Sequence, residues 1–232
     1  MSYYVLHLTS VDSTNKYLLE HADSLPDFTF LDADYQTAGK GRGERRWESK
    51  AGENLLCSLL VKERSVIGLG AFLSLVPAVV LSRILEKEGI QDVMIKWPND
   101  VYVGGKKIAG ILLQGDLPRC LVLGMGINLN QMDFVGDFRI APTSVALEKG
   151  IMIPHDQFRA RFYDSLANSL QNPAFSKNEF IAYYSSHDYL KGHRIELLGK
   201  QGLVLGVDED FGLLVQTKEG ILSLISGEAH LL

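Results

Sequence analysis

The sequence contains little that would cross-link the chain or cage a metal ion. Only Cys57 and Cys120 are cysteines among its 232 residues, and each lies inside an apolar run, where a thiol usually behaves as a small buried hydrophobe. The six histidines are scattered, with no Cys or His cluster at the spacing of zinc ligands. We therefore expect neither a structural disulfide nor a zinc ion held by the protein.

Long hydrophobic runs are also missing. The uncharged, mostly apolar stretch of residues 66–81 has 16 residues and includes Pro77, whereas a membrane span requires about 20 apolar residues. The N-terminus lacks the basic segment and the long apolar stretch of an export signal. These absences predict a cytoplasmic protein without a membrane segment, in which residues 66–81 form a buried helix.

The charge of the chain is acidic overall but basic in one place. The formal net charge is −5, which argues against a broad electrostatic grip on a nucleic acid backbone. Residues 39–50 carry five cations and only two carboxylates. A concentrated basic patch on an acidic protein indicates a small polyanion as its ligand.

Hydrophobic periodicity predicts an α+β fold with a mixed, mostly antiparallel sheet, because the strand-like runs do not alternate strictly with crossover helices. The predicted strands are residues 3–8, 28–35, 54–61, 93–97, 107–114 and 120–128. Asp12 and Ser13 are good caps for a helix that begins at Thr14, and Pro77 predicts a helix start or kink. An apolar stripe recurs every four residues from Phe158 to Leu170, as on the buried face of a helix.

The pattern changes near the C-terminus to short alternating segments that are separated by glycine-rich turns. We place the boundary between two domains here, at 1–187 and 188–232. A β unit of about 43 residues rarely has enough core to be stable alone. We therefore expect it to dock on the larger domain.

Residues 39–47, "GKGRGERRW", form a loop that suits an anion. Gly39, Gly41 and Gly43 are expected to take positive φ and turn their amides inward, while Lys40, Arg42, Arg45 and Arg46 add cations. The loop does not match the P-loop, which requires G-x-x-x-x-G-K-[ST]. It does not match the dinucleotide fingerprint either, because Glu44 stands where that motif requires a third glycine. By itself, the loop could also be a solvated basic loop without function.

Other polar stretches are embedded in predicted apolar strands, and together with the loop they resemble one known family. They are "DSTN" (12–15), "KWPND" (96–100), "KKIAGILLQ" (106–114), "GMGINLN" (124–130) and, as a weaker echo, "PTSV" (142–145). With "YQTAGKGRGERRW" (35–47) this set resembles the biotin protein ligase family, which shares its catalytic fold with class II aminoacyl-tRNA synthetases and lipoate ligases. The resemblance also implies that the small C-terminal unit is an SH3-like β-barrel.

The resemblance implies a two-step reaction in which biotin and ATP give biotinyl-5′-AMP, whose acyl group passes to a lysine of a biotin carboxyl carrier protein, a subunit of acetyl-CoA carboxylase. It implies Lys107 and Arg42 as the catalytic cations, and Asp100 as a residue that helps to position Mg²⁺. The biotin site would comprise Ser13, Thr14, Asn15, Gln36, Gly39, Lys40, Gly41, Arg42, Lys107 and Gly110. The ATP site would comprise Lys40, Arg42, Arg45, Trp47, Asn99, Lys107 and Asn128.

Each of these residues also has a plain structural interpretation. Ser13 and Thr14 could simply cap a helix, Gln36 could be a satisfied amide at a strand end, and Trp47 could be core. Two positions depart from the family pattern: Lys40 stands where arginine is common, and Glu44 stands where glycine is usual. Lysine replaces a planar bidentate fork with a point charge, and we expect the Glu44 carboxylate to turn outward.

The sequence leaves several alternatives open. A lipoate or octanoate ligase would use related chemistry on a related fold, a nucleic-acid-binding protein could use a basic loop and a β-barrel, and a catalytically dead protein could still bind an adenylate. "DSTN" begins at residue 12 and leaves no room before it for a helix-turn-helix, which favours a ligase without a DNA-binding domain. We expect a monomer or homodimer that acts on small-molecule substrates and binds neither nucleic acid nor membrane.

Overall fold

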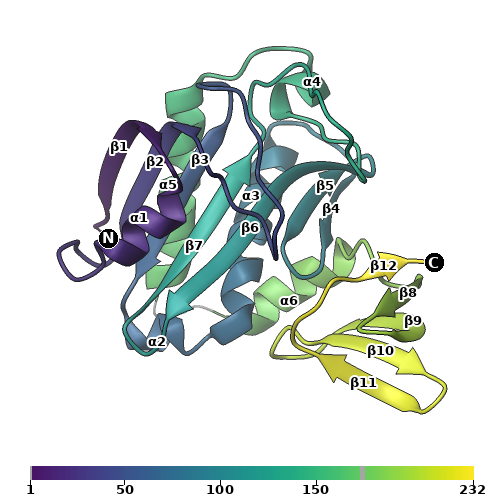
Figure 1. The fold of residues 1–232 in the computed structure, drawn as a ribbon. Coiled ribbons are helices and arrows are strands. Elements are labelled where there is room, and N and C mark those ends of the chain that lie inside the picture. Colours follow the sequence, from purple (N-terminus) through teal and green to yellow (C-terminus); the bar gives the residue numbers. More distant parts are fainter. Residues whose placement is uncertain (1, 173–175) are drawn as a thin grey trace.

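The computed structural model describes residues 2–172 and 176–232, and in this part of the chain the strands form two sheets (Figure 1). The larger sheet has seven strands in the order β1-β2-β3-β7-β6-β5-β4. These strands are β1 (Tyr4–Val11), β2 (Thr29–Gln36), β3 (Leu55–Val61), β4 (Val93–Lys96), β5 (Asp100–Val103), β6 (Lys106–Asp116) and β7 (Cys120–Ile127).

The sheet is mixed, as the sequence predicts. Strands β1 and β2 run parallel, and every other neighbouring pair in this sheet is antiparallel. The six predicted runs correspond to strands, and the structure adds β5, whose four residues follow directly on the turn at Pro98. The free edge of β4 is covered by a short connection in which the amide of Ile95 donates to the carbonyl of His187 at 2.7 Å.

Helices cover the two faces of this sheet unequally. In Figure 1, α1 (Thr14–Glu20) lies in front of the sheet, against β3 and β7, whereas α3 (Leu75–Lys87) and α5 (His155–Gln171) lie behind it. The remaining helical segments are α2 (Arg64–Ile67), the 3-10 helix η1 (Gly70–Ser74), α4 (Val145–Lys149) and α6 (Lys177–Ser186).

The predicted helices are confirmed, with one difference in the apolar run. Phe158, Phe162, Leu166 and Leu170 are all buried on α5, as their spacing requires. Residues 66–81 do not form one helix, because they are divided among α2, η1 and the start of α3, where Pro77 lies in the first turn. No helix in the described part of the chain is both long and apolar enough to cross a membrane.

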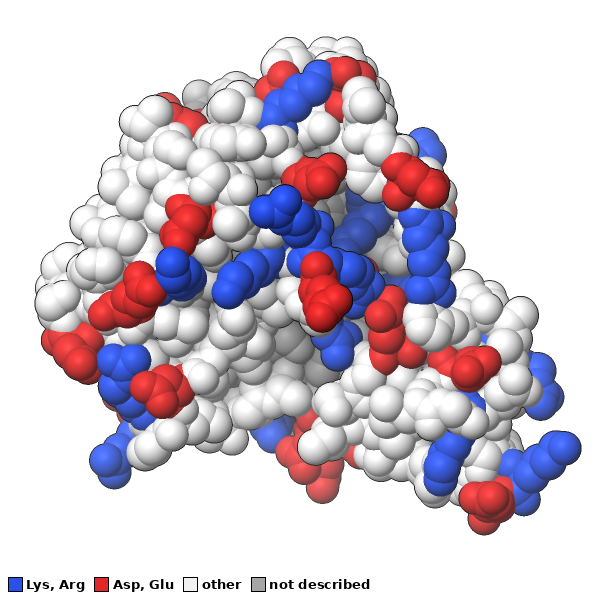
Figure 2. Space-filling view, in the orientation of Figure 1, with Lys and Arg blue, Asp and Glu red and all other residues white. Residues whose placement is uncertain are grey.

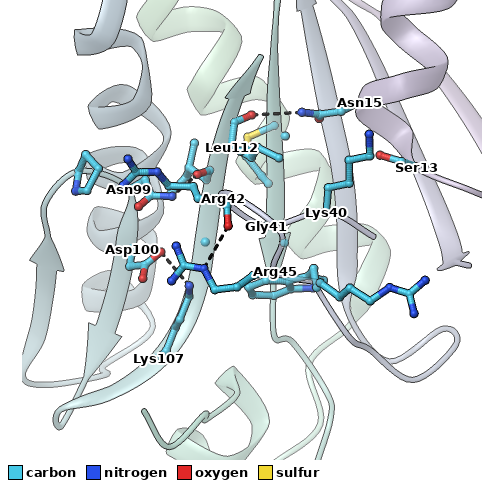
Figure 3. Close-up of a pocket in the computed structure, with 18 of the residues that line it drawn as sticks. Ser13, Asn15, Lys40, Gly41, Arg42, Arg45, Asn99, Asp100, Lys107 and Leu112 are labelled. Carbon is cyan, nitrogen blue, oxygen red and sulfur yellow. Dashed lines mark hydrogen bonds and ion pairs between the residues drawn. The ribbon is translucent and has the colours of Figure 1, made fainter. Parts of the chain in front are cut away.

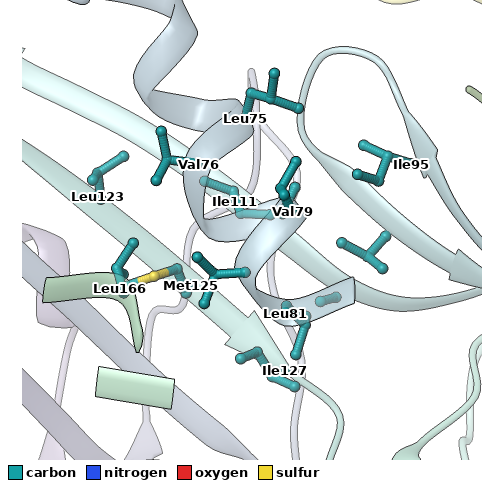
Figure 4. Close-up of a cluster of buried hydrophobic side chains, with 14 of the residues drawn as sticks. Leu75, Val76, Val79, Leu81, Ile95, Ile111, Leu123, Met125, Ile127 and Leu166 are labelled. Atoms are coloured by element: carbon teal, nitrogen blue, oxygen red, sulfur yellow. The ribbon is translucent and has the colours of Figure 1, made fainter. Parts of the chain in front are cut away.

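The main core lies between the rear face of the sheet and α3 and α5. Figure 4 shows how Val76 and Val79 of α3 and Leu166 of α5 meet Leu123 and Met125 of β7. The front face has a smaller apolar cluster, in which Leu18 of α1 packs on Leu31, Leu60 and Val122. Both cysteines are buried free thiols.

The second sheet is antiparallel and is built from the C-terminal residues. Its order is β11-β10-β9-β8-β12, where the strands are β8 (Arg194–Leu197), β9 (Lys200–Val207), β10 (Leu213–Thr217), β11 (Gly220–Leu224) and β12 (His230–Leu231). Its Phe211 is buried, packs edge-on against Phe72 and Tyr184, and accepts a hydrogen bond of 2.9 Å from Trp97 Nε1. The C-terminal unit therefore docks on the larger part, as expected.

Candidate active site

A cleft opens on the front face of the large sheet, between α1, the glycine loop and β4–β7 (Figure 3). Ser13 and Asn15 lie toward one end of this cleft and Asp100 and Lys107 toward the other, with Lys40 and Arg42 between them. The cleft encloses about 140 Å³, which is less than the roughly 300 Å³ at the lower end of small-molecule sites. A nucleotide could enter only if side chains that now fill the cleft moved.

The floor of the cleft is flat because glycines occur in register on neighbouring strands. Gly126 of β7 pairs with Gly110 of β6, and Gly124 pairs with Leu112. The Trp47 indole lies across the first pair, and a Cβ atom at Gly126 would overlap its ring. A Cβ atom at Gly124 would overlap the Asn15 amide in the same way. These glycines are required for the close approach of other groups to the strands.

The polar end of the cleft is formed by the start of α1. Ser13 is the N-cap residue but its hydroxyl makes no capping hydrogen bond, so its predicted role as a side-chain cap is wrong. The Thr14 backbone N–H donates to Gln36 Oε1 at 2.8 Å, and the Thr14 hydroxyl oxygen lies 3.0 Å from the same atom. Asn15 donates to Gln114 Oε1 at 2.9 Å. All of these side chains except Gln114 line the cleft.

The glycine loop is a short hairpin that is held by its own backbone. The Gly41 N–H donates to the carbonyl of Arg45 at 2.8 Å, and the Trp47 N–H donates to the carbonyl of Gly39 at 3.0 Å. Of the three loop glycines only Gly43 has positive φ, so that prediction is wrong for the other two. Gly39 is needed instead because a Cβ atom there would overlap the Trp47 carbonyl oxygen. Its backbone lines a neighbouring groove rather than the cleft.

The loop cations point in different directions. Arg42 extends into the cleft, whereas the Arg45 side chain turns to Glu228 of the C-terminal unit, with Nη1 and Oε1 2.7 Å apart. Burial, followed by the charge of Arg45, lowers the pKa of the Arg42 guanidinium, which nevertheless stays protonated as arginines in proteins do. A half-buried cation of this kind favours an anionic ligand that would replace its lost hydration. Glu44 is exposed, as expected.

Lys107 is fixed at the other end of the cleft by β6 and its neighbours. Its Nζ lies 2.8 Å from Asp100 Oδ1 and 5.6 Å from the centre of the Trp47 ring. Gly110, one place beyond "KKIA", leaves room for the end of this lysine, since a Cβ atom there would lie 3.2 Å from Nζ. A cation therefore stands beside the flat floor on which Trp47 lies.

Asn99 and Asn128 are both expected to belong to the ATP site, but only Asn99 lines the cleft. Asn99 lines the cleft, where its Nδ2 donates to the Ile111 carbonyl at 2.6 Å. Asn128 is buried outside the cleft lining, and its Nδ2 donates to the Thr143 carbonyl at 2.9 Å. The amide of Asn128 thus holds the segment that follows β7.

The structure adds residues that the sequence did not single out. Lys96 of the "KWPND" stretch lines the cleft, and burial lowers the pKa of its ammonium group. Glu228 and Ala229 come from the C-terminal unit and line the same cleft. The lysine lies within a motif and could have been identified, but nothing in the local sequence marks Glu228. Figure 2 shows lysine and arginine side chains gathered around the hollowed centre of this face.

Asp100 is the one predicted metal residue, and its surroundings limit what it can hold. No group of three or more His, Cys, Asp or Glu side chains that could hold a metal occurs among residues 2–172 and 176–232. A single carboxylate that already pairs with Lys107 does not make a protein cage. It suits Mg²⁺ that arrives with nucleotide phosphates, since this ion keeps waters and takes only one or two carboxylates.

The comparison with known families agrees with this arrangement. Residues 8–128, which include α1, the glycine loop, Asp100 and Lys107, match the model of the biotin/lipoate A/B protein ligase family. The chain belongs to this family. The mixed sheet with its helices and a second, antiparallel C-terminal sheet is the fold of biotin protein ligases, which confirms the predicted fold class.

Individual relatives match over nearly the whole chain. The bifunctional ligase/repressor BirA of Escherichia coli is 31% identical over 237 residues, which cover 97% of this chain and 73% of the relative. The biotin–[acetyl-CoA-carboxylase] ligase of Mycobacterium tuberculosis is 30% identical over 208 residues, or 85% and 76% of the two chains. A solved structure of the Aquifex aeolicus biotin protein ligase with biotin and ATP superimposes with a TM-score of 0.86 at 30% identity, covering 99% of this chain and 98% of the other.

Proposed function

We propose that this protein activates biotin with ATP to biotinyl-5′-AMP and pyrophosphate, and then transfers biotin to a lysine of a biotin carboxyl carrier protein. The observation that carries the proposal is the cleft itself, which has neutral donors and acceptors at one end and cations at the other. The relatives named as biotin ligases support the choice of substrate.

The neutral end suits the ureido ring of biotin. That ring has both N–H donors and a carbonyl acceptor, and it needs partners of both kinds in a dry site. Ser13, Thr14 and Asn15 are each less than 5% exposed, and Gln36 lies beside them. The valeryl chain would then run along the glycine floor toward the cations, which the absence of Cβ atoms at Gly110 and Gly126 permits.

The cationic end suits the meeting of two anions. Attack of the biotin carboxylate on the α-phosphate builds charge on the phosphorus oxygens, and a fixed cation beside them stabilises the transition state. Lys107 would supply that charge, and its ion pair with Asp100 holds the Nζ in place before the ligands bind. Arg42 and Lys40 would close over the acyl phosphate, while Arg45 would reach the leaving pyrophosphate after parting from Glu228.

Trp47 and Asn99 would contact the nucleotide base. In the present structure Trp47 occupies the floor that the ligands would need, with its Nε1 buried and unpaired within the described part of the chain. Movement of the indole would open the cleft and expose this donor. Mg²⁺ would come with the nucleotide, with Asp100 as its ligand from the protein, and would neutralise phosphate charge there.

The experiment that tests the proposal is exchange of labelled pyrophosphate into ATP by the purified protein. We expect exchange to depend on biotin, and subsequent transfer to a carrier domain to depend on its target lysine. Exchange that is stimulated by octanoate or lipoate in place of biotin would indicate a lipoate or octanoate ligase instead. No exchange with any of these acids would contradict the proposal.

Closure of the loop over the adenylate has its own test. A reactive anhydride must be kept from water and from other amines until the carrier arrives. Arg42→Gly should let biotinyl-AMP escape, so that bystander proteins become biotinylated in the presence of ATP. Detection of biotin on added albumin measures this, and labelling equal to that by the unmodified enzyme would contradict the role of Arg42.

A further inference from the structure

A buried serine lies beneath the polar end of the cleft. Ser58 of β3 pairs with Gly124 of β7, its side chain is fully buried, and it is not part of the cleft lining. Its Oγ lies 2.7 Å from Thr14 Oγ1 and 2.6 Å from Asn15 Oδ1. The missing Cβ atom of Gly124 leaves the space in which Asn15 reaches this serine. Ser58 therefore connects both α1 residues to the sheet.

Backbone groups fix the orientation of the two amides in this network. The Asn15 atom that contacts the Leu112 carbonyl (3.2 Å) must be the nitrogen, because a carbonyl only accepts, so Oδ1 faces Ser58. The Gln36 atom that contacts the Thr14 N–H (2.8 Å) must be the oxygen, because that group only donates. Neither amide can be flipped without placing like groups against each other.

Two hydroxyl protons must then serve three oxygen–oxygen contacts. These contacts are Ser58 to Asn15 (2.6 Å), Ser58 to Thr14 (2.7 Å) and Thr14 to Gln36 (3.0 Å). The two shortest are both satisfied only if Ser58 donates to Asn15 and Thr14 donates to Ser58. The contact left without a proton is then the longest, and Gln36 Oε1 still accepts from the Thr14 N–H. Any other assignment leaves two oxygens within 2.7 Å with no proton between them, which is costly in a buried site.

We infer that Ser58 is a positioning residue that draws the Thr14 hydroxyl proton inward, so that the Thr14 oxygen can only accept a hydrogen bond from a ligand in the cleft. This inference rests on the proposed function. A ureido N–H meets such an acceptor, whereas the chain of an octanoyl or lipoyl group has no N–H and leaves it unpaired. A site built to hydrogen-bond a substrate N–H rejects analogues that lack one. Ser58 thus favours the ureido ring over a plain acyl chain, although it does not touch the ligand.

Ser58→Ala tests this assignment because it frees the Thr14 proton and removes the donor to Asn15. We expect the KM for biotin in pyrophosphate exchange to rise about 10-fold, which is the effect of losing one buried hydrogen-bond partner. The kcat and the KM for ATP should stay within about twofold, as when only ground-state binding is lost. The ratio of kcat/KM for biotin to that for octanoate should fall about 10-fold with it. An unchanged biotin KM and ratio in the folded variant would overturn the inference.

Ser82→Ala is the matched control. Ser82 is also fully buried, but its hydroxyl donates to the Ala78 carbonyl within α3 at 2.8 Å, on the other side of the sheet. We expect it to leave the biotin KM unchanged. Ser58→Cys keeps a weak donor at nearly the same volume and should give a smaller rise in KM than alanine. A rise as large as that of Ser58→Ala would contradict a role of the proton.

A measurement on the unmodified enzyme covers the case in which the alanine variant does not fold. The two cyclic carbamate analogues of biotin each replace one ureido N–H by oxygen with little change in size. We expect one of them to bind about 100-fold more weakly than biotin, because it opposes an oxygen to the Thr14 oxygen. Equal binding of biotin and both analogues would overturn the inference. Absence of biotin-dependent exchange in the unmodified enzyme would instead overturn the proposed function itself.

Discussion

The two faces of the larger sheet use the same strands for opposite purposes. On β3 and β7, the side chains of Leu59 and Leu123 point to the rear and are fully buried in the main core. The adjacent Ser58 side chain points to the front, beneath the cleft, where its partner Gly124 has no side chain. The rear face is filled by large aliphatic side chains, and the front face is kept low by glycines in register. Alternation along a strand lets one face stabilise the sheet while the other leaves room for a ligand.

The two faces also differ in how their polar side chains are paired. Behind the sheet, the buried Asp32 carboxylate is paired with Tyr163 and Arg159. In front of it, Thr14 pairs with Gln36 and Asn15 pairs with Gln114, and Thr14, Asn15 and Gln36 still face an open cleft. A substitution on the front face should therefore change function and a substitution on the rear face should change stability.

The largest expected effect is at Lys107. Lys107→Ala removes the cation that the proposed mechanism places beside the reacting anions, and it should lower adenylate formation at least about 100-fold, as loss of a single transition-state donor does elsewhere. Its matched control is Lys106→Ala, because the adjacent lysine is exposed and faces Glu148 instead. Measurement of pyrophosphate exchange and of the melting temperature separates function from folding. Near-normal exchange in Lys107→Ala would contradict the proposed role.

The rear face is tested by Leu123→Ala. Removal of a fully buried leucine should lower the free energy of unfolding by about 2–5 kcal/mol, since both transfer free energy and packing are lost. Below the melting temperature the biotin KM should not change. Urea denaturation measures the first quantity and pyrophosphate exchange the second. A raised KM would show that the two faces are not independent.

Gly126→Ala is the complementary change on the front face. The added Cβ atom would overlap the Trp47 ring, so the indole must shift and the floor under the ligands is raised. We expect kcat/KM for biotin to fall about 10-fold or more, whereas the free energy of unfolding should change by less than about 1.5 kcal/mol. Calorimetry measures the change in the free energy of unfolding, and pyrophosphate exchange on the same preparation measures kcat/KM for biotin. Full activity would mean that the floor does not need to be flat.

The smallest effect concerns the charged network behind the sheet. His7 Nδ1 lies 2.5 Å from Asp32 Oδ1, and this hydrogen bond raises the pKa of His7 above its ordinary value, although nearby Arg159 opposes it. The stabilisation is fully present below the unfolded pKa of about 6.5 and is lost as pH rises through the folded pKa. The urea midpoint should therefore fall slightly on going from pH 6 to pH 8. His7→Gln should remove this slope, and a midpoint that rises with pH would contradict the pairing.

Local patterns were enough to predict the elements but not the way in which they meet. The stripe from Phe158 to Leu170 and the strand runs depend on neighbours no more than four residues away, and the structure confirms them. The motif residues Arg42 and Lys107 line one cleft, as a shared ligand would require. Ser58 and Glu228 escaped notice because their partners, Asn15 and Arg45, are 43 and 183 residues distant. The loop glycines were explained by positive φ, although close approach to Trp47 is what constrains Gly39.

The position of the Trp47 indole makes the cleft observable by fluorescence. Both tryptophans of the sequence line the cleft, but Trp97 is buried and anchored by a hydrogen bond to the Phe211 carbonyl, whereas Trp47 Nε1 has no partner in the described part of the chain. Emission that changes when small molecules are added should therefore arise from Trp47. On the proposed function, the indole must move away from Gly110 and Gly126 before a nucleotide can enter. The observed rate of the fluorescence change should therefore reach a plateau at high ATP concentration, and the plateau value would give the rate at which the cleft opens.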